Sequence, residues 1–381
     1  MVEAGLLETL QTTLAALGRP YTPLDVAGAL RTSGVAVTDA KVHEVLAELR
    51  RQSTGAGPLE HLLLEPGVSD VVVNGPREVF VDRGSGLEPA GVSFVDDEQV
   101  RRLAIRLAAA AGRRLDDAAP FVDGRLPNGV RLHAVLAPVA APGTCLSLRV
   151  PAARHFSLAD LIRAGSIGEE GAALLKGIVA GRVPFLVSGG TGSGKTTLLA
   201  ALLALVPERE RIVLVEDARE LEPSHPHCVR LEGRPANSEG AGAITLTALV
   251  RQALRMRPDR VVLGEVRGAE LTDLLTALNT GHEGGCGTVH ANSVADVPAR
   301  LEALAALGGL GRDACHAQVA AALKVVIHMR RDQGGQRRVE QLGIFRRGAD
   351  GVVRICTAVT FAPSGIGWGD GADELRALVR P

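Results

Sequence analysis

The spacing of apolar and polar residues divides the chain into segments of different type. Near the amino terminus, five leucines recur at helical spacing: Leu6, Leu7, Leu10, Leu14 and Leu17. A second amphipathic pattern over residues 42–49 predicts another helix, and the Gly- and Pro-containing stretch 53–58 predicts a hinge. We therefore predict a helical module over residues 1–54. A helix-turn-helix DNA reader within residues 22–50 is an alternative, but no cluster of Lys and Arg supports it, and we favour a docking or packing bundle.

Residues 57–150 mix the strand and helix patterns. Strand-like runs at 70–73 and 79–81 precede a helical pattern over 97–111. The Leu-Pro-Asn-Gly sequence at 126–129 indicates a turn between two further strands. Together these patterns predict a mixed α/β domain.

The next part of the chain alternates regularly between short apolar runs and helical patterns. After a predicted linker at 151–157, residues 158–360 contain predicted strands at 183–187, 211–215 and 260–263, and predicted helices at 195–205, 245–256 and 268–279. This alternation predicts a parallel sheet with crossover helices. Turn residues at 333–336 and 348–351 indicate hairpins, and we expect residues 361–381 to form a loosely ordered, Gly-rich tail.

The composition narrows the classes of function. Hydrophobic residues make up 46% of the 381 residues and aromatic residues only 2%, so the cores must be built from Leu, Val, Ala and Ile. Scarce aromatic rings argue against a groove that stacks single-stranded bases, and a net charge of -1 provides no basic field. We therefore do not expect nucleic acid as a partner.

The sequence shows no mark of membrane insertion or export. No apolar run approaches the ~20 residues that span a bilayer, and the basic start of a signal peptide is missing. The five cysteines are scattered without a C-x-x-C pair, which favours free thiols in a reducing cytoplasm over disulfides or a structural zinc. We predict that any membrane role comes through partners.

Residues 189–196 form the motif that restricts the chemistry most. They read Gly-Gly-Thr-Gly-Ser-Gly-Lys-Thr, which fits the phosphate-loop pattern G-x-x-x-x-G-K-[ST], and they lie between a predicted strand and a predicted helix. Such a turn directs backbone N–H groups and the positive end of the helix at one spot, which suits a di- or triphosphate. An accidental Gly-rich turn would lack these two flanks. We therefore predict that the chain binds a nucleotide.

The phosphate loop also assigns individual contacts. Lys195 would reach the β- and γ-phosphates, and the hydroxyl of Thr196 would bind Mg²⁺. The predicted nucleotide-binding residues of this segment are Gly189, Gly190, Thr191, Gly192, Ser193, Gly194, Lys195, Thr196 and Thr197.

Two predicted strands after the phosphate loop end in carboxylates. The first ends in Glu216 and Asp217, and the second in Glu265. In an open parallel sheet, ligands gather at the carboxyl ends of the strands, where carboxylates can hold Mg²⁺ and polarise an attacking water. A strand can also end in a solvated acidic residue, but two such ends after a phosphate loop favour the metal and water role.

A polar, Gly-rich segment at 280–292 contains His282 and His290. We favour a γ-phosphate sensor here over a metal site, because Cys286 and the two histidines lack a usual zinc spacing. Arginines are concentrated around this part of the chain: Arg230, Arg234, Arg251, Arg255, Arg257, Arg260 and Arg267. Most are expected to be solvated or structural, but one or two, with Arg267 as the candidate, would act on the nucleotide of a neighbouring subunit.

In this order and spacing, the motifs resemble those of the type II/type IV secretion-system ATPases. The resemblance runs from residue 57 to about residue 360 and includes the phosphate loop, an "Asp box" at 216–220, a Gly-Glu at 264–265 and a "His box" at 282–290. Six segments look most like the tight-adherence (Tad, Flp-pilus) branch, the CpaF-like ATPases: 57–60, 73–76, 123–129, 234–240, 254–260 and 279–282.

The resemblance implies an architecture and a function. It implies a RecA-like motor domain over residues 158–360, a PAS-like α/β domain over residues 57–150, and a homo-hexamer that binds ATP and Mg²⁺. It also implies a cytoplasmic ATPase, peripheral at the inner face of the cell membrane, that works with a polytopic inner-membrane platform protein. ATP hydrolysis would power Tad/Flp pilus assembly or type II/IV secretion of pilin or other substrates.

For individual residues, the resemblance implies that Glu216 is the general base and that Glu265 supports the metal and the water. It implies that His290 senses the γ-phosphate, and that Arg131 and Arg149 of the amino-terminal domain reach the nucleotide.

One departure from the family pattern bears on turnover. Residues 285–287 read Gly-Cys-Gly where the family carries small hydroxyl residues, and we expect the change to affect sensor geometry or rate rather than ATP binding. It keeps open a nucleotide-gated scaffold with little turnover. A nucleic-acid-dependent RecA-like ATPase of a conjugation or DNA-transfer system is the other alternative.

Overall fold

The computed structural model describes residues 6, 9–10, 13–14, 22–53, 55–151, 156–234, 236, 241–281, 283–332, 334–362 and 365–380, without the side chains of 47–53. The chain divides into two compact units, residues 1–152 and 153–381. Some predictions fall outside the described residues: those on Leu7, Leu17 and His282, on most of the linker 151–157, and on parts of 234–240, 333–336 and 361–381.

Two helices of the first unit, α2 (Pro23–Thr32) and α3 (Asp39–Ser53), precede its sheet. Their apolar residues, among them Val26, Leu30 and Val45, are buried in a small core of their own. The start of α2 carries a capping box, in which the Thr22 hydroxyl accepts from the N–H of Asp25 and the Asp25 carboxylate accepts from the N–H of Thr22. Helical structure in this segment was predicted from its sequence.

A six-stranded antiparallel sheet forms the rest of the first unit. Its elements are η1 (Gly57–Leu59), α4 (Glu60–Leu63), β1 (Asp70–Asn74), β2 (Val79–Asp82), β3 (Leu87–Pro89), α5 (Asp97–Ala110), β4 (Phe121–Arg125), β5 (Arg131–Val135) and β6 (Cys145–Arg149). The strand order is β3-β2-β1-β6-β5-β4. Helix α5 buries Val100, Leu103 and Leu107 in the same core as the alternate, inward-facing strand residues. The mixed α/β domain predicted here was confirmed.

The second unit contains the phosphate loop. Its elements are α6 (Leu158–Arg163), α7 (Glu169–Ala180), β7 (Phe185–Gly189), α8 (Lys195–Leu203), β8 (Ile212–Glu216), β9 (Cys228–Glu232), α9 (Leu246–Ala253), η2 (Leu254–Met256), β10 (Arg260–Leu263), α10 (Glu270–Asn279), β11 (Cys286–His290), α11 (Val297–Leu307), α12 (Arg312–Ala322), β12 (Val325–Arg331), β13 (Arg337–Arg347), β14 (Val353–Ala362), β15 (Gly365–Trp368) and α13 (Ala372–Val379).

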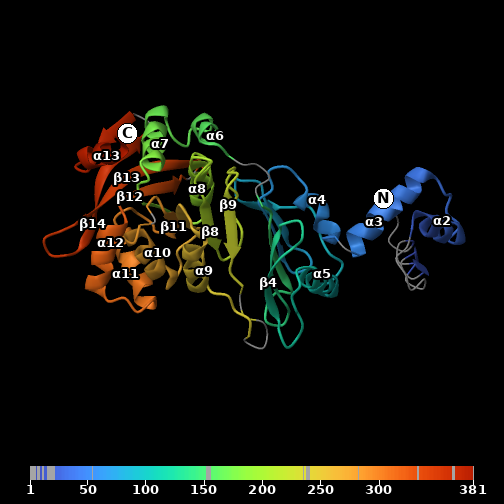
Figure 1. Cartoon of the computed structure of the whole chain (residues 1–381). Coiled ribbons are helices and arrows are strands. Elements are labelled where there is room, and N and C mark those ends of the chain that lie inside the picture. Colours follow the sequence, from blue (N-terminus) through green and yellow to red (C-terminus); the bar gives the residue numbers. More distant parts are fainter. Residues whose placement is uncertain are drawn as a thin grey trace. The chain divides into compact units, whose positions relative to one another are not determined.

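These strands form one sheet in the order β15-β14-β13-β12-β7-β11-β10-β8-β9. Neighbouring strands from β12 to β9 are parallel, whereas β12, β13, β14 and β15 pair as antiparallel hairpins. Two apolar cores cover its two faces, one built with α6, α7, α8 and α13 and the other with α9, α10, α11 and α12 (Figure 1). Because both faces are covered, every residue of β7, β8 and β10 is buried.

The predicted strands and helices of this unit lie within a few residues of the observed ones, and both predicted hairpins are present. Three strands, β9, β11 and β15, were not predicted. The expected loose tail was wrong for most of its length, since residues 365–368 and 372–379 form β15 and α13. Leu375 of α13 is fully buried, and a Cβ on Gly177 of α7 would lie 2.7 Å from Val379, so this helix belongs to the core.

Arg260 connects the start of β10 to neighbouring elements through a buried ion pair. Its side chain is 1% exposed, Nε donates to Oε2 of Glu210 at 2.8 Å, and a terminal nitrogen donates to the carbonyl of Val179 at 2.9 Å. The role toward a nucleotide that we considered for this arginine is therefore replaced by a structural one.

We expect Arg260→Met to lower the free energy of unfolding of the second unit by about 3–5 kcal/mol, because it leaves the buried carboxylate of Glu210 without its main partner. Urea unfolding would measure the loss. The double variant Arg260→Met/Glu210→Met should recover most of it, and a double variant as unstable as the single one would contradict the explanation.

Candidate functional site

The phosphate loop connects the buried strand β7 to α8 through two glycines whose backbone excludes other residues. Gly189 has φ of 152°, and a Cβ there would lie 2.4 Å from the carbonyl oxygen of Met329. Gly194, with φ of 94°, is the amino-terminal cap of α8. Both positions have backbone angles that only glycine adopts without strain. The loop therefore turns sharply into the helix, as the sequence predicted, with the free N–H groups of the helix start at its end.

Lys195 is held inside the phosphate loop. It is 7% exposed, and its Nζ donates to the carbonyls of Gly189 at 3.0 Å and Gly190 at 2.8 Å. Burial lowers the pKa of the Lys195 ammonium, and Glu265 acts in the opposite direction. The ammonium thus lies at the concave side of the loop, close enough to Glu265 for a direct electrostatic effect.

The register of the sheet brings the predicted strand ends together. His290 on β11 pairs with Gly189 on β7, and Leu263 on β10 pairs with Val215 on β8. The carboxyl ends of β7, β11, β10 and β8 therefore lie side by side at one edge. Since β11 separates β7 from β10, it is His290 that lies between the phosphate loop and Glu265.

Glu265 is the centre of a group joined by hydrogen bonds and ion pairs that we call the Glu265 cluster: Asp217, Glu265, Arg267 and His290. One carboxylate oxygen of Glu265 lies 2.6 Å from Nε2 of His290, and the other accepts from Arg267 at 2.6 Å. Arg267 also lies 3.7 Å from Asp217. Burial, with a smaller effect of Lys195, lowers the pKa of His290, and the carboxylate of Glu265 acts in the opposite direction.

Glu216 is more buried than the sequence suggests. It is 4% exposed, and its Oε1 accepts from the N–H groups of Glu220 at 3.1 Å and Leu221 at 2.9 Å. Its Oε2 is buried without a hydrogen-bond partner. Gly264 lies directly against it, since a Cβ at that glycine would be 2.5 Å from Cγ of Glu216. Burial outweighs the two hydrogen bonds and raises the pKa of Glu216 to about 7.

This raised pKa predicts how stability depends on pH. Between about pH 4.5 and 7 the folded chain keeps a proton on Glu216 that the unfolded chain has released, so the free energy of unfolding falls as pH rises, by up to about 3 kcal/mol. Glu216→Gln keeps the acceptor and carries no charge. We expect its urea-unfolding free energy to vary less over this window and to exceed that of the wild type above pH 7. Parallel pH profiles for the two proteins would contradict this prediction.

Sequence reasoning did not single out Arg337, and it named Glu220 only as part of the Asp box at 216–220, without a role. Nε of Arg337, the first residue of β13, donates to the carbonyl of Gly192 at 2.9 Å. Glu220 raises the pKa of Lys195, although Glu265 does so more strongly. The arginine pairs 330–331 and 337–338 on either side of a Gly-Gly turn were a visible signal, but no motif connected them with the loop.

Not all of the arginines that we predicted to act on the nucleotide lie at the Glu265 cluster. Arg131 and Arg149 belong to the first unit, where they pair across β5 and β6 and Arg149 lies 3.0 Å from Asp70. Their role toward the nucleotide stays a prediction. Arg230 forms an ion pair with Glu222, and Arg251 forms one with Asp273. Among the arginines that we predicted around the site, Arg267 is the one in the Glu265 cluster.

The unusual Gly-Cys-Gly sequence lies away from the phosphates. Cys286 starts β11 and pairs with Phe185 at the start of β7, whereas His290 ends the strand beside Gly189. Cys286 is buried in the apolar core, and burial raises the pKa of its thiol to about 12. At about 3.3 Å per residue, the departure is on the order of 13 Å from the phosphate end of the strand.

The arrangement fits a magnesium–nucleotide complex. The described residues contain no group of three or more His, Cys, Asp and Glu side chains that could hold a metal alone. Mg²⁺, however, usually takes one or two carboxylates together with phosphate oxygens. The carboxylate of Glu265 is a suitable donor, and Thr196 lies in the first turn of α8. The unpartnered oxygen of Glu216 is buried and would serve as a donor only once it is uncovered.

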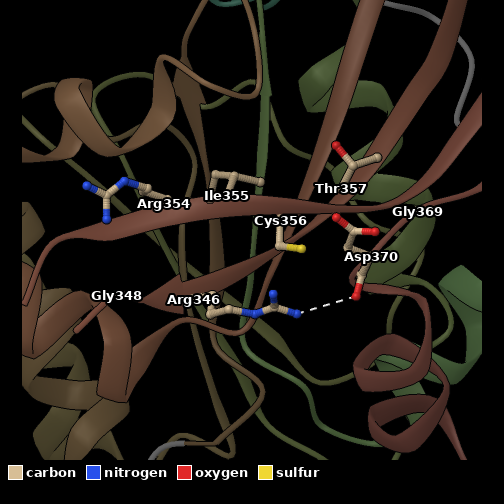
Figure 2. Close-up of a pocket in the computed structure, with 8 residues that line it drawn as sticks. All are labelled: Arg346, Gly348, Arg354, Ile355, Cys356, Thr357, Gly369 and Asp370. Carbon is tan, nitrogen blue, oxygen red and sulfur yellow. Dashed lines mark hydrogen bonds between the residues drawn. The ribbon is translucent and has the colours of Figure 1, made fainter. Parts of the chain in front are cut away.

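A separate cavity of about 460 Å³ opens on the antiparallel part of the sheet. Figure 2 shows Cys356 and Asp370 close to Arg346, which donates to the carbonyl of Asp370 at 3.4 Å. The lining residues are Arg346, Gly348, Arg354, Ile355, Cys356, Thr357, Gly369 and Asp370. None of the residues predicted to bind nucleotide lines this cavity.

No helix within the described part of the chain is long and apolar enough to cross a membrane.

Comparison with known proteins gives consistent matches. The family model described as "Type II/IV secretion system protein" matches residues 52–352. A Mycobacterium tuberculosis protein provisionally named for conjugal transfer is 57% identical over 346 residues, which cover 88% of this chain and 97% of that protein. The type IV secretion system protein PtlH of Bordetella pertussis is 35% identical over 250 residues, 59% of this chain and 73% of that protein.

Solved structures share the fold. The pilus retraction motor PilT with bound ADP aligns with a TM-score of 0.52 at 18% identity, covering 84% of each chain. The Yersinia pseudotuberculosis ATPase DotB aligns with a TM-score of 0.53 at 18% identity, covering 77% of this chain and 78% of that one. The RecA-like second unit with an α/β domain before it was thus confirmed as the fold class.

Proposed function

The chain belongs to the type II/IV secretion system protein family, and on this premise we propose that it is an ATPase that hydrolyses ATP to ADP and phosphate with Mg²⁺. The Glu265 cluster is the observation that carries the proposal. In it a carboxylate, a histidine and a guanidinium contact one another, and the carboxylate and the guanidinium lie within electrostatic range of the lysine of a phosphate loop. Phosphoryl transfer needs positioned charge of this kind and little covalent chemistry from the protein.

Each residue has a proposed task. The start of α8 and Lys195 bind the phosphates, and Thr196 and Glu265 face the metal, which would neutralise charge on the phosphate oxygens. Each oxygen of Glu265 has one polar partner, His290 on one side and Arg267 on the other, and keeps a further lone pair that could face the metal. His290 would meet the γ-phosphate, as the family resemblance implies.

Glu216 is the proposed general base. Its pKa of about 7 lies near the working pH, as proton transfer in the transition state favours. Its Oε2 is buried and has no partner, so a proton could be accepted there without breaking a bond. Because the side chain is covered, the segment 217–221 must shift before a water can reach it.

Beyond hydrolysis, we propose a motor of the Tad/Flp-pilus, CpaF-like branch. The six segments that resemble this branch support the assignment, and the family supports work with secretion machinery. The proposed partners are further copies of the chain in a hexamer, a polytopic inner-membrane platform protein, and pilin or another exported substrate. We propose that the ring works in the cytoplasm at the inner face of the membrane.

One observation favours the DNA-transfer alternative, namely the conjugal-transfer name of the relative that is 57% identical. The net charge of -1 and the 2% of aromatic residues oppose it. Steady-state phosphate release by the full chain, with and without DNA at several salt concentrations, tests both. We expect turnover that needs Mg²⁺ and ignores DNA. A many-fold DNA stimulation that declines steeply with salt would favour the alternative.

The scaffold alternative rests on the Gly-Cys-Gly sequence at 285–287, which lies at the opposite end of β11 from His290. The same phosphate-release assay tests it directly, because a scaffold would bind nucleotide without steady turnover.

A further inference from the structure

His328 lies next to the phosphate loop on the strand that sequence reasoning did not connect with the site. On β12 it pairs with Ser188 of β7, and the following residue, Met329, pairs with Gly189, where the loop begins. His328 is 3% exposed and Ser188 is fully buried. The apolar core on this face of the sheet includes Leu186 and Val326, although Gln341 lies opposite His328 on β13. A polar pair in such a place is costly unless its hydrogen bonds are made.

The ring of His328 has partners on two sides. Nδ1 lies 2.9 Å from the hydroxyl oxygen of Ser188. Burial lowers the pKa of His328, while the charge of Glu340 and, less strongly, a hydrogen bond to the backbone of Asn292 raise it. A neutral ring has one acceptor and one donor nitrogen, so Nδ1 can accept from Ser188 while the other nitrogen donates to Asn292. Asn292 comes two residues after His290.

The backbone around His328 is specialised. The pairing of β12 with β13 shifts register between His328 and Met329, with His328 opposite Gln341 and Met329 opposite Val339. Such a bulge changes the direction of a side chain and is frequent next to active sites. Here the bulge lies at His328, whose ring reaches the segment that follows β11.

We propose that His328 is a positioning residue that ties the strand of the phosphate loop to the segment His290–Asn292, and so holds His290 against Glu265. This inference rests on the proposed ATPase function. His328 itself touches none of the residues assigned to phosphate or metal. It acts through His290, the residue that lies between Gly189 and Glu265.

A double-mutant cycle in the full chain tests the proposal. We expect His328→Phe to lower kcat about tenfold, the usual scale for a residue that orients a functional group, with KM changed less than about twofold. In a His290→Ala background the same substitution should have little further effect, because the residue it positions is gone. His328→Gln keeps a donor and an acceptor and should restore most of kcat.

A matched control is available in the same unit. His316 is also 3% exposed, and its Nδ1 accepts from the N–H of Val353 at 3.2 Å, outside the site. His316→Phe should lower the melting temperature without changing kcat. If His328→Phe fails to fold, Ser188→Ala removes the other end of the same hydrogen bond. Additive effects of the His328 and His290 substitutions, or a change in KM alone, would overturn the inference.

A second measurement separates this inference from the proposed function. Amide hydrogen exchange of the nucleotide-free chain should be faster at residues 290–292 in His328→Phe or Ser188→Ala than in the wild type, and unchanged in His316→Phe. Unchanged exchange in the first two variants sinks the positioning role. If exchange at residues 290–292 is faster in these two variants but the wild-type chain shows no ATP turnover, the positioning role stands and the ATPase assignment is rejected.

Discussion

Glu265→Gln is expected to lower kcat for ATP hydrolysis by about 10²–10⁴-fold while nucleotide binding changes only a few-fold. The substitution keeps the size of the side chain but removes the charge that meets His290, Arg267 and the metal. Lost charge matters most in the transition state, so kcat should fall more than affinity. Steady-state phosphate release gives kcat, and titration with a fluorescent ADP analogue gives affinity.

The control for this variant is Glu374→Gln. Glu374 forms an ion pair with Arg346 beside the cavity on the antiparallel part of the sheet. This exposed pair should contribute little, and turnover should stay at the wild-type value. If Glu265→Gln turned over at the wild-type rate as well, the Glu265 cluster would have no part in hydrolysis.

Lys195→Ala is expected to reduce turnover below detection. The variant loses the ammonium that would contact two phosphates, and charge-assisted hydrogen bonds contribute roughly 1.5–3 kcal/mol each. Together they correspond to about 10²–10⁴-fold in kcat/KM. Calorimetric titration with Mg·ATP should show a matching loss of affinity, in contrast to Glu265→Gln, which stays bound to nucleotide.

Lys176→Ala serves as the matched control for charge. Lys176 is an exposed residue of α7 in the same unit, and its loss changes the net charge equally. We expect full activity and unchanged affinity from it. Wild-type affinity in Lys195→Ala would mean that the loop at 189–196 does not hold the phosphates.

Local sequence patterns were enough to predict the phosphate loop and the strands that carry Glu216 and Glu265. Glycine positions, apolar runs and capping residues determine the structure of the few residues around them. The sequence alone is therefore enough to predict these local elements. The α/β class and the two hairpins followed for the same reason. Even the amphipathic helices at the amino terminus needed only helical spacing.

The contacts that build the site depend on strand register and could not be read in this way. The segment Cys286–His290 belongs to a stretch that the sequence marks only as polar and Gly-rich, yet it forms a strand between β7 and β10 because both neighbours supply backbone partners. That placement joins His290 to Glu265. The burial of Arg260 and the contact of Arg337 with Gly192 likewise join residues 50 and 145 positions apart.

The bond from Arg337 to Gly192 has a practical consequence for anyone who trims this protein. A fragment that stops at residue 331 would retain each motif recognisable in the sequence. It would nevertheless lose the guanidinium that supports the loop carbonyl, together with β13, β14 and α13, which complete one apolar core. The smallest piece able to hold a nucleotide is therefore larger than the sum of its recognisable motifs.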